Sequence, residues 1–518
     1  MTITSLHSAD AGRDEASVQS ILEGLGPDEL GDVFDLGDFG RAVALSRDRL
    51  TEHLERDSVE GVRQEHPGEL LREARALMSE GETAFDQRRF ADILDLYLRT
   101  GIKVNSRGYM ARQFSSVPPV SAVFDMVTAL APQPASFYEA GPLPNVADKL
   151  IAEEFGERLG WAPDSFEMVS TSGASLANLT AVLAARNHHF AQAWKGGVRP
   201  DSRGRPAVAI GADSHFSVSR IAGILGLGED QVVRLPLNAR RQIAVEHAGP
   251  TLDEAARGGL NVFCIVAAAG STSTGANDPL QALAALARER GAWFHVDAAH
   301  NGAFLVSDHL RQRVRGLELA DSFCLDAHKT LFTPAACTLL FYRERGLAAA
   351  AFPQKASYVF DPEEDEISRF ESGVKNFECT KRPSILNLWL IWALYGRRFF
   401  EAKLDYLVDL TRTAHDHIRD LPDFTVSHEP ESNILCFVHH PQGSAGLDID
   451  RLQLELRNRV RDANRYFISK VDLDGATNLR IVMMNHRIGE ADIVGLVEEI
   501  RRHGRDIVQD WNSQVVAA

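Results

Sequence analysis

An aspartate and a lysine each follow a short apolar stretch in the middle of the chain. Asp297 closes the stretch 294–296, and Lys329 comes directly after His328, beyond the stretch 322–325. A carboxylate can keep a pyridine nitrogen protonated, and a lysine amine can form a Schiff base with an aldehyde. A pyridoxal phosphate enzyme requires both groups. The pair therefore predicts this cofactor, which in turn narrows the chemistry.

Small and hydroxyl residues fill the segment 170–178, which precedes an apolar helical stretch at 179–185. Such a segment lets the backbone approach a ligand, and the first amides of a helix can hold a phosphate. Alone, the pattern indicates an ordinary helix cap. With Asp297 and Lys329 downstream, it favours a phosphate site.

Two histidines also fit a pyridoxal phosphate site. His215 follows the apolar stretch 207–210 and can stack on a pyridine ring, while His328, beside Lys329, can donate to a phosphate. The alternatives are a structural or surface role for His215 and a hydrogen-bonded core position for His328.

Composition excludes several classes of protein. The chain has 518 residues, 44% hydrophobic and 25% charged, with a formal net charge of −17. This acidity argues against nucleic acid and anionic membranes as partners. Five cysteines without a CxxC pair give no zinc signature and indicate a reducing compartment, so we expect no metal site.

The first residues show no targeting signal. Residues 1–19 have neither a basic region nor an apolar core, which argues against a signal peptide. No apolar run reaches the roughly 18 residues that a membrane span needs. We therefore expect a cytoplasmic protein.

The pattern along the chain predicts an α/β fold in three sections. Residues 1–105 read as a charged helical section that could pack on a partner subunit. Residues 106–395 alternate short β-like runs with helical stretches, which predicts a mostly parallel sheet with helices on both faces. The expected strands are 207–210, 262–266, 293–296, 322–325 and 337–341. Residues 396–518 read as a smaller α+β domain. Ligands bind beyond the carboxyl ends of the strands in such sheets, where Asp297 and Lys329 are expected.

These motifs together resemble those of the group II pyridoxal-dependent amino acid decarboxylases. The branch most similar to this chain acts on glutamate, cysteine sulfinate and aspartate. The resemblance covers residues 105–505. It rests on the segments 137–142, 172–178, 213–217, 269–272, 295–299 and 326–329, in this order and spacing.

The resemblance implies a fold-type I architecture, a homodimer and a set of roles. Lys329 matches the Schiff-base lysine, Asp297 the partner of the pyridine nitrogen, and His215 the stacking histidine. Further matches are Ala299 beneath the ring, Ala174, Ser175 and His328 at the phosphate, Arg480 at the substrate α-carboxylate, and Gln113 and Ser115 near the substrate.

Tyr358 matches the family's loop tyrosine, which protonates the α-carbon after carbon dioxide leaves. It lies 29 residues after Lys329 and precedes the polar segment 361–366, which suits a surface loop. The alternative is an aromatic anchor at a loop base. Two departures, Ala268 for a threonine and His300 for an aromatic residue, are expected to reshape the pocket.

The predicted function is α-decarboxylation of an L-amino acid, acidic or small and polar, to the amine. One alternative is decarboxylation coupled to oxidative deamination, which gives an aldehyde; Tyr358 argues against it. Another is a catalytically silent, cofactor-binding scaffold. The presence of Lys329, Asp297 and His215 argues against that.

Overall fold

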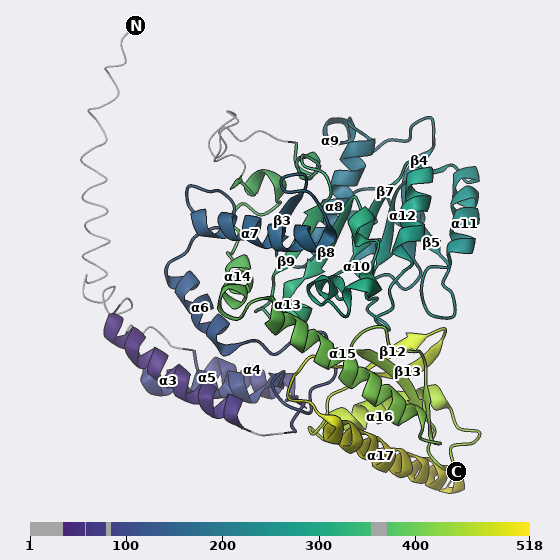
Figure 1. The fold of residues 1–518 in the computed structure, drawn as a ribbon. Coiled ribbons are helices and arrows are strands. Elements are labelled where there is room, and N and C mark those ends of the chain that lie inside the picture. Colours follow the sequence, from purple (N-terminus) through teal and green to yellow (C-terminus); the bar gives the residue numbers. More distant parts are fainter. Residues whose placement is uncertain (1–34, 57–58, 79–83, 354–369, 518) are drawn as a thin grey trace, which may run out of the picture.

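A computed structural model describes residues 35–56, 59–78, 84–353 and 370–517 (Figure 1). Three groups of elements lie side by side: a large sheet with its helices, a smaller sheet with three long helices, and a set of N-terminal helices. None of the described helices is long and apolar enough to cross a membrane.

The large sheet has seven strands in the order β3-β9-β8-β7-β6-β4-β5. They are β3 (Glu167–Thr171), β4 (Arg205–Gly211), β5 (Val232–Leu235), β6 (Leu260–Ala268), β7 (Trp293–Asp297), β8 (Ser322–Asp326) and β9 (Thr338–Tyr342). Strand β9 runs antiparallel to both of its neighbours, and the other pairs are parallel. The expected mostly parallel sheet is confirmed.

Helices cover both faces of this sheet. They are α6 (Pro119–Leu130), α7 (Pro142–Leu159), α8 (Ala174–His189), α9 (Ala193–Gly196), α10 (Phe216–Ile224), α11 (Val245–Arg257), α12 (Leu280–Glu289), α13 (Ala327–Thr330) and α14 (Ile385–Tyr395). Helices α8 and α10 share one apolar cluster with one face, whereas α7, α11, α12 and α14 share another with the opposite face.

Side chains alternate between these two clusters along each strand, because successive residues of a strand point to opposite faces. On β7, Phe294 and Val296 belong to the cluster with α7 and α12. Trp293 belongs to the cluster with α8. His295 and Asp297 share the parity of Trp293 and therefore face α8.

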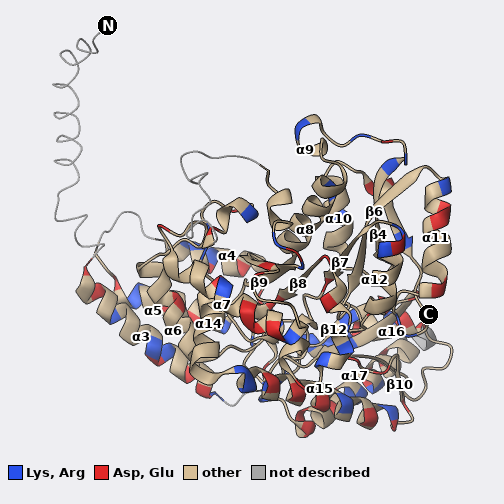
Figure 2. Ribbon diagram, turned by 45° about the horizontal axis from the view of Figure 1, so that its top comes forward, with Lys and Arg blue, Asp and Glu red and all other residues tan. Residues whose placement is uncertain are grey.

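The C-terminal part is built on a four-stranded antiparallel sheet in the order β10-β11-β13-β12. Its elements are β10 (Phe424–Val426), β11 (Ile434–His439), β12 (Ser469–Leu473), β13 (Ala476–Val482), α15 (Arg397–Arg419), α16 (Ile449–Asp462) and α17 (Glu490–Ala517). Charges of both signs lie along outer helices such as α3, α11 and α15 (Figure 2).

The N-terminal section contains α3 (Leu36–Glu55), α4 (Pro67–Ala76) and α5 (Gln87–Arg99), with a short pair of strands, β1 (Val62–Arg63) and β2 (Gly101–Ile102). Side chains at the Ncap positions fix the starts of two of these helices: Asp35 accepts from an amide of α3, and Asp86 accepts from two amides of α5. The chain then runs to the C-terminal sheet, where Tyr109 forms a bridge with Phe467.

Candidate active site

A cavity of about 240 Å³ lies where β4, β6, β7 and β8 end. This is the edge of a parallel sheet at which ligands bind. Its lining includes seven residues predicted from the sequence. They are Ala174, Ser175, His215, Asp297, Ala299, His328 and Lys329. The structure therefore brings together side chains that are up to 155 positions apart in the sequence.

Donors surround the carboxylate of Asp297. The Asn178 amide donates to its Oδ2 at 2.9 Å, and the backbone N–H of Ala299 donates to its Oδ1 at 3.2 Å. The thiol of Cys324 lies 3.8 Å from the same Oδ1. These contacts fix the orientation of the Asp297 carboxylate.

Lys329 lies on the short helix α13 and forms an ion pair with Asp326, at 3.0 Å between Nζ and Oδ2. Thr338 donates to the other oxygen of Asp326. Burial alone would lower the pKa of Lys329, but the carboxylates of Asp326 and Asp297 outweigh burial and hold it above its usual value. The Lys329 amine therefore carries a positive charge unless a bound molecule changes its surroundings.

His215 is the Ncap residue of α10, and its ring lines the cavity. Its Nδ1 accepts from the backbone N–H of Ser217 at 3.3 Å, so the proton of a neutral ring lies on Nε2. Burial is the main reason that the pKa of His215 falls below its usual value. A neutral, partly buried imidazole is suited to lie against an aromatic ring.

The segment 170–178, which the sequence predicts to bind a phosphate, contains the start of α8. Gly173, the Ncap residue, has φ of 109°, a left-handed conformation that favours glycine. Ala174 and Ser175 begin the helix and line the cavity, so their end of α8 carries the partial positive charge of a helix N-terminus. This arrangement fits an anionic group.

Three predicted substrate residues do not line the cavity. Arg480, only 5% exposed, lies behind the segment 272–273 and donates to the carbonyl oxygens of Thr272 and Ser273 at 2.7 and 3.0 Å. Burial lowers its pKa to about 10. Ser115 donates to the carbonyl oxygen of His328 at 3.1 Å.

Gln113 lies on the same segment as Ser115. Earlier on this segment, the carbonyl oxygen of Ala111 accepts from Arg480 at 3.4 Å. Along this segment, Gln113 therefore lies between Ala111, which contacts Arg480, and Ser115, which contacts His328. Its amide nitrogen is buried and has no hydrogen-bond partner among the described residues. Tyr358 falls outside the described residues.

Both departures from the family pattern, Ala268 and His300, line the cavity. The Nε2 atom of His300 lies 2.7 Å from Oδ1 of Asn433, which precedes β11. His300 thus joins the cavity wall to the C-terminal sheet. Burial lowers its pKa to about 3, so the ring is neutral.

Sequence reasoning missed the side chains that hold the predicted ones. Asp326 is three residues before Lys329, and this spacing on a short helix was a usable signal. Asn178 was part of the predicted phosphate segment, but its contact with Asp297 spans 119 positions. Only the fold reveals that contact.

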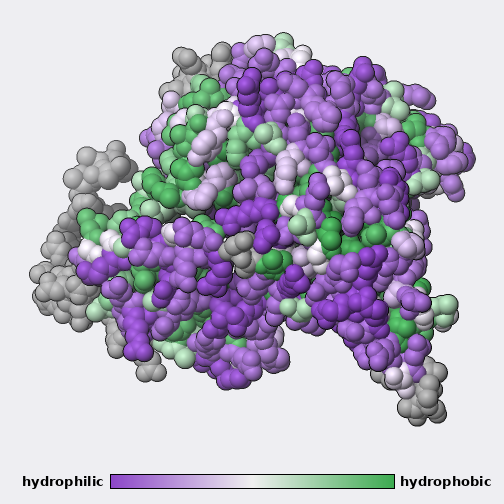
Figure 3. All heavy atoms as spheres, turned by 60° about the horizontal axis from the view of Figure 1, so that its bottom comes forward, coloured by the Kyte–Doolittle hydropathy of each residue, from purple (hydrophilic) through white to green (hydrophobic). Residues whose placement is uncertain are grey.

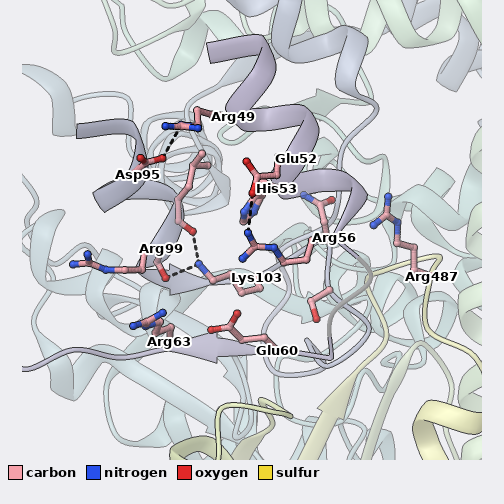
Figure 4. Close-up of a pocket in the computed structure, with 13 residues that line it drawn as sticks. Arg49, Glu52, His53, Arg56, Glu60, Arg63, Asp95, Arg99, Lys103 and Arg487 are labelled. Carbon is pink, nitrogen blue, oxygen red and sulfur yellow. Dashed lines mark hydrogen bonds and ion pairs between the residues drawn. The ribbon is translucent and has the colours of Figure 1, made fainter. Parts of the chain in front are cut away.

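A second cavity, of about 170 Å³, is lined mostly by charged residues of the N-terminal section (Figure 4). Asp95 lies 3.0 Å from Arg49, and Glu52 lies 3.3 Å from Arg56. Lys103 donates to the last carbonyl oxygens of α5, which carry the partial negative charge of a helix C-terminus. These pairings give the charges structural roles, and we assign no chemistry to this cavity.

Comparison with solved structures shows the same fold in three enzymes. Mouse CSAD is 24% identical with a TM-score of 0.83, covering 91% of this chain and 100% of that chain. Oryza sativa TDC with PLP and tryptamine is 20% identical with a TM-score of 0.83, covering 92% and 99%. Rhodiola rosea 4-hydroxyphenylacetaldehyde synthase is 17% identical with a TM-score of 0.79, covering 92% and 99%.

The family model of the pyridoxal-dependent decarboxylase conserved domain matches residues 86–440, well over half of the chain. The matched range includes Asp297, Lys329 and the start of α8, which meet at the cavity. The chain therefore belongs to the pyridoxal-dependent decarboxylases and is an enzyme whose cofactor is pyridoxal phosphate.

Proposed function

We propose that this enzyme removes the α-carboxyl group of an L-amino acid as carbon dioxide and releases the amine. The substrate has an acidic or a small polar side chain. The observation that carries the proposal is the meeting of Asp297 and Lys329 at one cavity, with the start of α8 beside them.

The residues present fit the cofactor. Pyridoxal phosphate supplies an aldehyde and a pyridine ring that accepts an electron pair when its nitrogen is protonated. Lys329 offers the amine for the aldehyde, and Asp297 offers the anion for the nitrogen. Ala299 and His215 would contact the ring, while Ala174, Ser175 and His328 would hold the phosphate. The left-handed backbone at Gly173 and the first amides of α8 would form the cradle for the phosphate.

The charges of the site set what each residue can do. Asp297, whose carboxylate accepts from Asn178 and from the backbone N–H of Ala299, favours a proton on a basic nitrogen placed against it. Lys329 must lose its proton before its amine can bond to an aldehyde. Asp326, 3.0 Å away, opposes that loss and therefore tunes the pH at which Lys329 reacts.

Arg480 and Gln113 are our candidates for binding the substrate. Arg480 donates to carbonyl and hydroxyl oxygens, and none of the described carboxylates forms an ion pair with it. A buried guanidinium without an anion is suited to a substrate carboxylate. Gln113, with its unpartnered amide nitrogen, and Ser115 come from the segment between Arg480 and His328 and would face the substrate side chain.

Tyr358 is our candidate for delivering a proton to the α-carbon, on the basis of its spacing from Lys329. A phenol is a suitable proton donor. Without such a donor, oxygen would compete and an aldehyde would form. We keep aldehyde formation as the alternative because one protein with a similar fold is an aldehyde synthase.

We further infer a cytoplasmic homodimer. The free cysteines suit a reducing compartment. Figure 3 shows apolar groups interrupting a largely hydrophilic face. The large apolar side chains that are exposed on α5, α6 and α14 are Ile93, Tyr97, Val123, Val127, Leu130, Leu394 and Tyr395. A second copy would cover such a surface.

The activity is tested with a panel of L-amino acids, scored for carbon dioxide, amine and aldehyde. We expect one substrate class to give amine and carbon dioxide in equal amounts. Lys329→Ala should abolish both turnover and the absorbance of bound cofactor, whereas Lys470→Ala, an exposed lysine on β12, should change neither. Normal decarboxylation by Lys329→Ala would refute its role, and aldehyde as the main product would favour the alternative.

The homodimer is tested by mixing Lys329→Ala with Tyr358→Phe. If the site takes Tyr358 from the neighbouring subunit, each mixed dimer has one site with both groups intact, and activity returns. Sedimentation measures the oligomer, and differently tagged subunits demonstrate exchange. Exchange without recovered activity would show that each site uses its own tyrosine.

Asp326→Asn is expected to lower the pKa of Lys329, because it removes the anion nearest the amine. The pH profile for covalent attachment of the cofactor, followed by absorbance, should therefore move to lower pH by about 1–3 units, the usual effect of one close opposite charge. Thr338→Val, which removes a hydrogen bond from Asp326 but keeps its charge, is the control. An unmoved profile, or one at higher pH, would contradict this ion pair's role.

A further inference from the structure

Polar side chains continue behind Asp297, away from the cavity. On β7, Trp293 and His295 share the parity of Asp297 and face α8. Strand β8 pairs in parallel with β7, so that Ser322 lies beside His295 and Cys324 beside Asp297. The register therefore places a row of polar groups on one face of the sheet, and Asn178 on α8 lies over that row.

Hydrogen bonds join this row into one chain. Trp293 Nε1 donates to Ser322 Oγ at 2.8 Å, and Ser322 Oγ lies 2.8 Å from His295 Nδ1. His295 Nε2 lies 2.8 Å from Asn178 Oδ1. Asn178 Nδ2 then donates to Asp297 Oδ2 at 2.9 Å.

The direction of every hydrogen in this chain follows from Asp297. A carboxylate only accepts, so the Asn178 amide must turn its nitrogen toward Asp297 and its oxygen toward His295. His295 must then carry its proton on Nε2 to donate to Asn178. Its Nδ1 lies 2.8 Å from the Ser322 hydroxyl and 3.1 Å from the Ser322 backbone oxygen, and it is left to accept from the hydroxyl. Ser322 can donate because its own oxygen receives the proton of Trp293. The Cys324 thiol, at 3.0 Å, also donates to Asn178 Oδ1.

The buried histidine keeps this direction fixed. His295 is 0% exposed, and burial lowers its pKa to about 4, so the ring stays neutral through neutral pH. Its position could have been apolar: Cys264 and Val266, on the neighbouring strand β6, belong to the same buried cluster as α8. A buried polar row costs free energy unless each member is paired. Here the pairing ends on the carboxylate at the cavity.

We propose that Asn178, oriented by His295, is a positioning residue for the cofactor. It presents a donor and never an acceptor to Asp297, which fixes the carboxylate in one orientation. Asp297 can then hold a proton on the ring nitrogen of bound pyridoxal phosphate. The role rests on the family's cofactor and is independent of the substrate.

The test compares Asn178→Asp with Thr180→Val. The aspartate keeps the shape of the asparagine but places a second carboxylate against Asp297. Thr180 lies on the same helix, is 1% exposed, and its hydroxyl has no hydrogen-bond partner among the described residues, so its replacement is a matched buried control.

The primary readout is the ¹⁵N chemical shift of cofactor labelled at its ring nitrogen, which reports protonation without turnover. In Asn178→Asp the two adjacent carboxylates share a proton, which takes negative charge away from Asp297. We therefore expect a protonated nitrogen in the native protein and in Thr180→Val, and a nitrogen that loses its proton at lower pH in Asn178→Asp. Cofactor dissociation should be faster, and activity should fall about 10–100-fold, as when outer partners of metal ligands are removed.

A second pair of variants separates positioning from structure. His295→Gln keeps an N–H that can reach Asn178, whereas His295→Leu does not. We expect the glutamine variant to retain most of the native nitrogen signal and the leucine variant to lose it. If Asn178→Asp does not fold, this pair alone decides. A native signal in His295→Leu, with lower thermal stability only, would overturn the proposal and leave the row a structural feature.

Discussion

The carboxylate of Asp297 is the group on which the rest of the site depends. It stands at the end of a central strand, with its oxygens toward the cavity and its donors supplied from α8, β8 and its own turn. Such partners hold the carboxylate in one orientation toward the cavity. The parallel register of β7 and β8 also places the Cys324 thiol beside it.

The same register separates the two carboxylates that serve the site. Asp297 ends β7 and Asp326 ends β8. Asp326 forms an ion pair with Lys329, whereas we propose that Asp297 faces the ring nitrogen of the cofactor. Neighbouring parallel strands with side chains of one parity thus place an acid for the cofactor and an acid for the lysine on one edge. The antiparallel strand β9 contributes Thr338, which fixes the second acid.

Much of this was predictable from the sequence, since the signals were local. Five of the seven strands of the large sheet follow from β-like runs between helical stretches. The central residues Asp297 and Lys329 follow from their places after such runs. Strands β3 and β5 were missed: β3 begins with Glu167 and Met168, and β5 is only four residues long with Arg234 in it, so neither has a strong apolar pattern.

What the sequence could not reveal depends on distant contacts. Asn178 on α8 contacts Asp297 at the end of β7, and Arg480 in the C-terminal sheet contacts the segment 272–273. No spacing rule brings such residues together, because loop lengths between them are free to vary. His300 shows the same limit: its type marked a departure, but only the fold shows that it ties the cavity wall to Asn433.

The central claim, that Asp297 works as an anion at the cofactor's ring nitrogen, is tested most directly with Asp297→Asn. The amide has the same shape and can still accept a hydrogen bond, but it carries no charge. The measurement is carbon dioxide release per bound cofactor, with cofactor content determined on the same sample. We expect a folded protein that still binds cofactor and loses most of its turnover, by about 100-fold or more. Near-native turnover at full cofactor loading would contradict it.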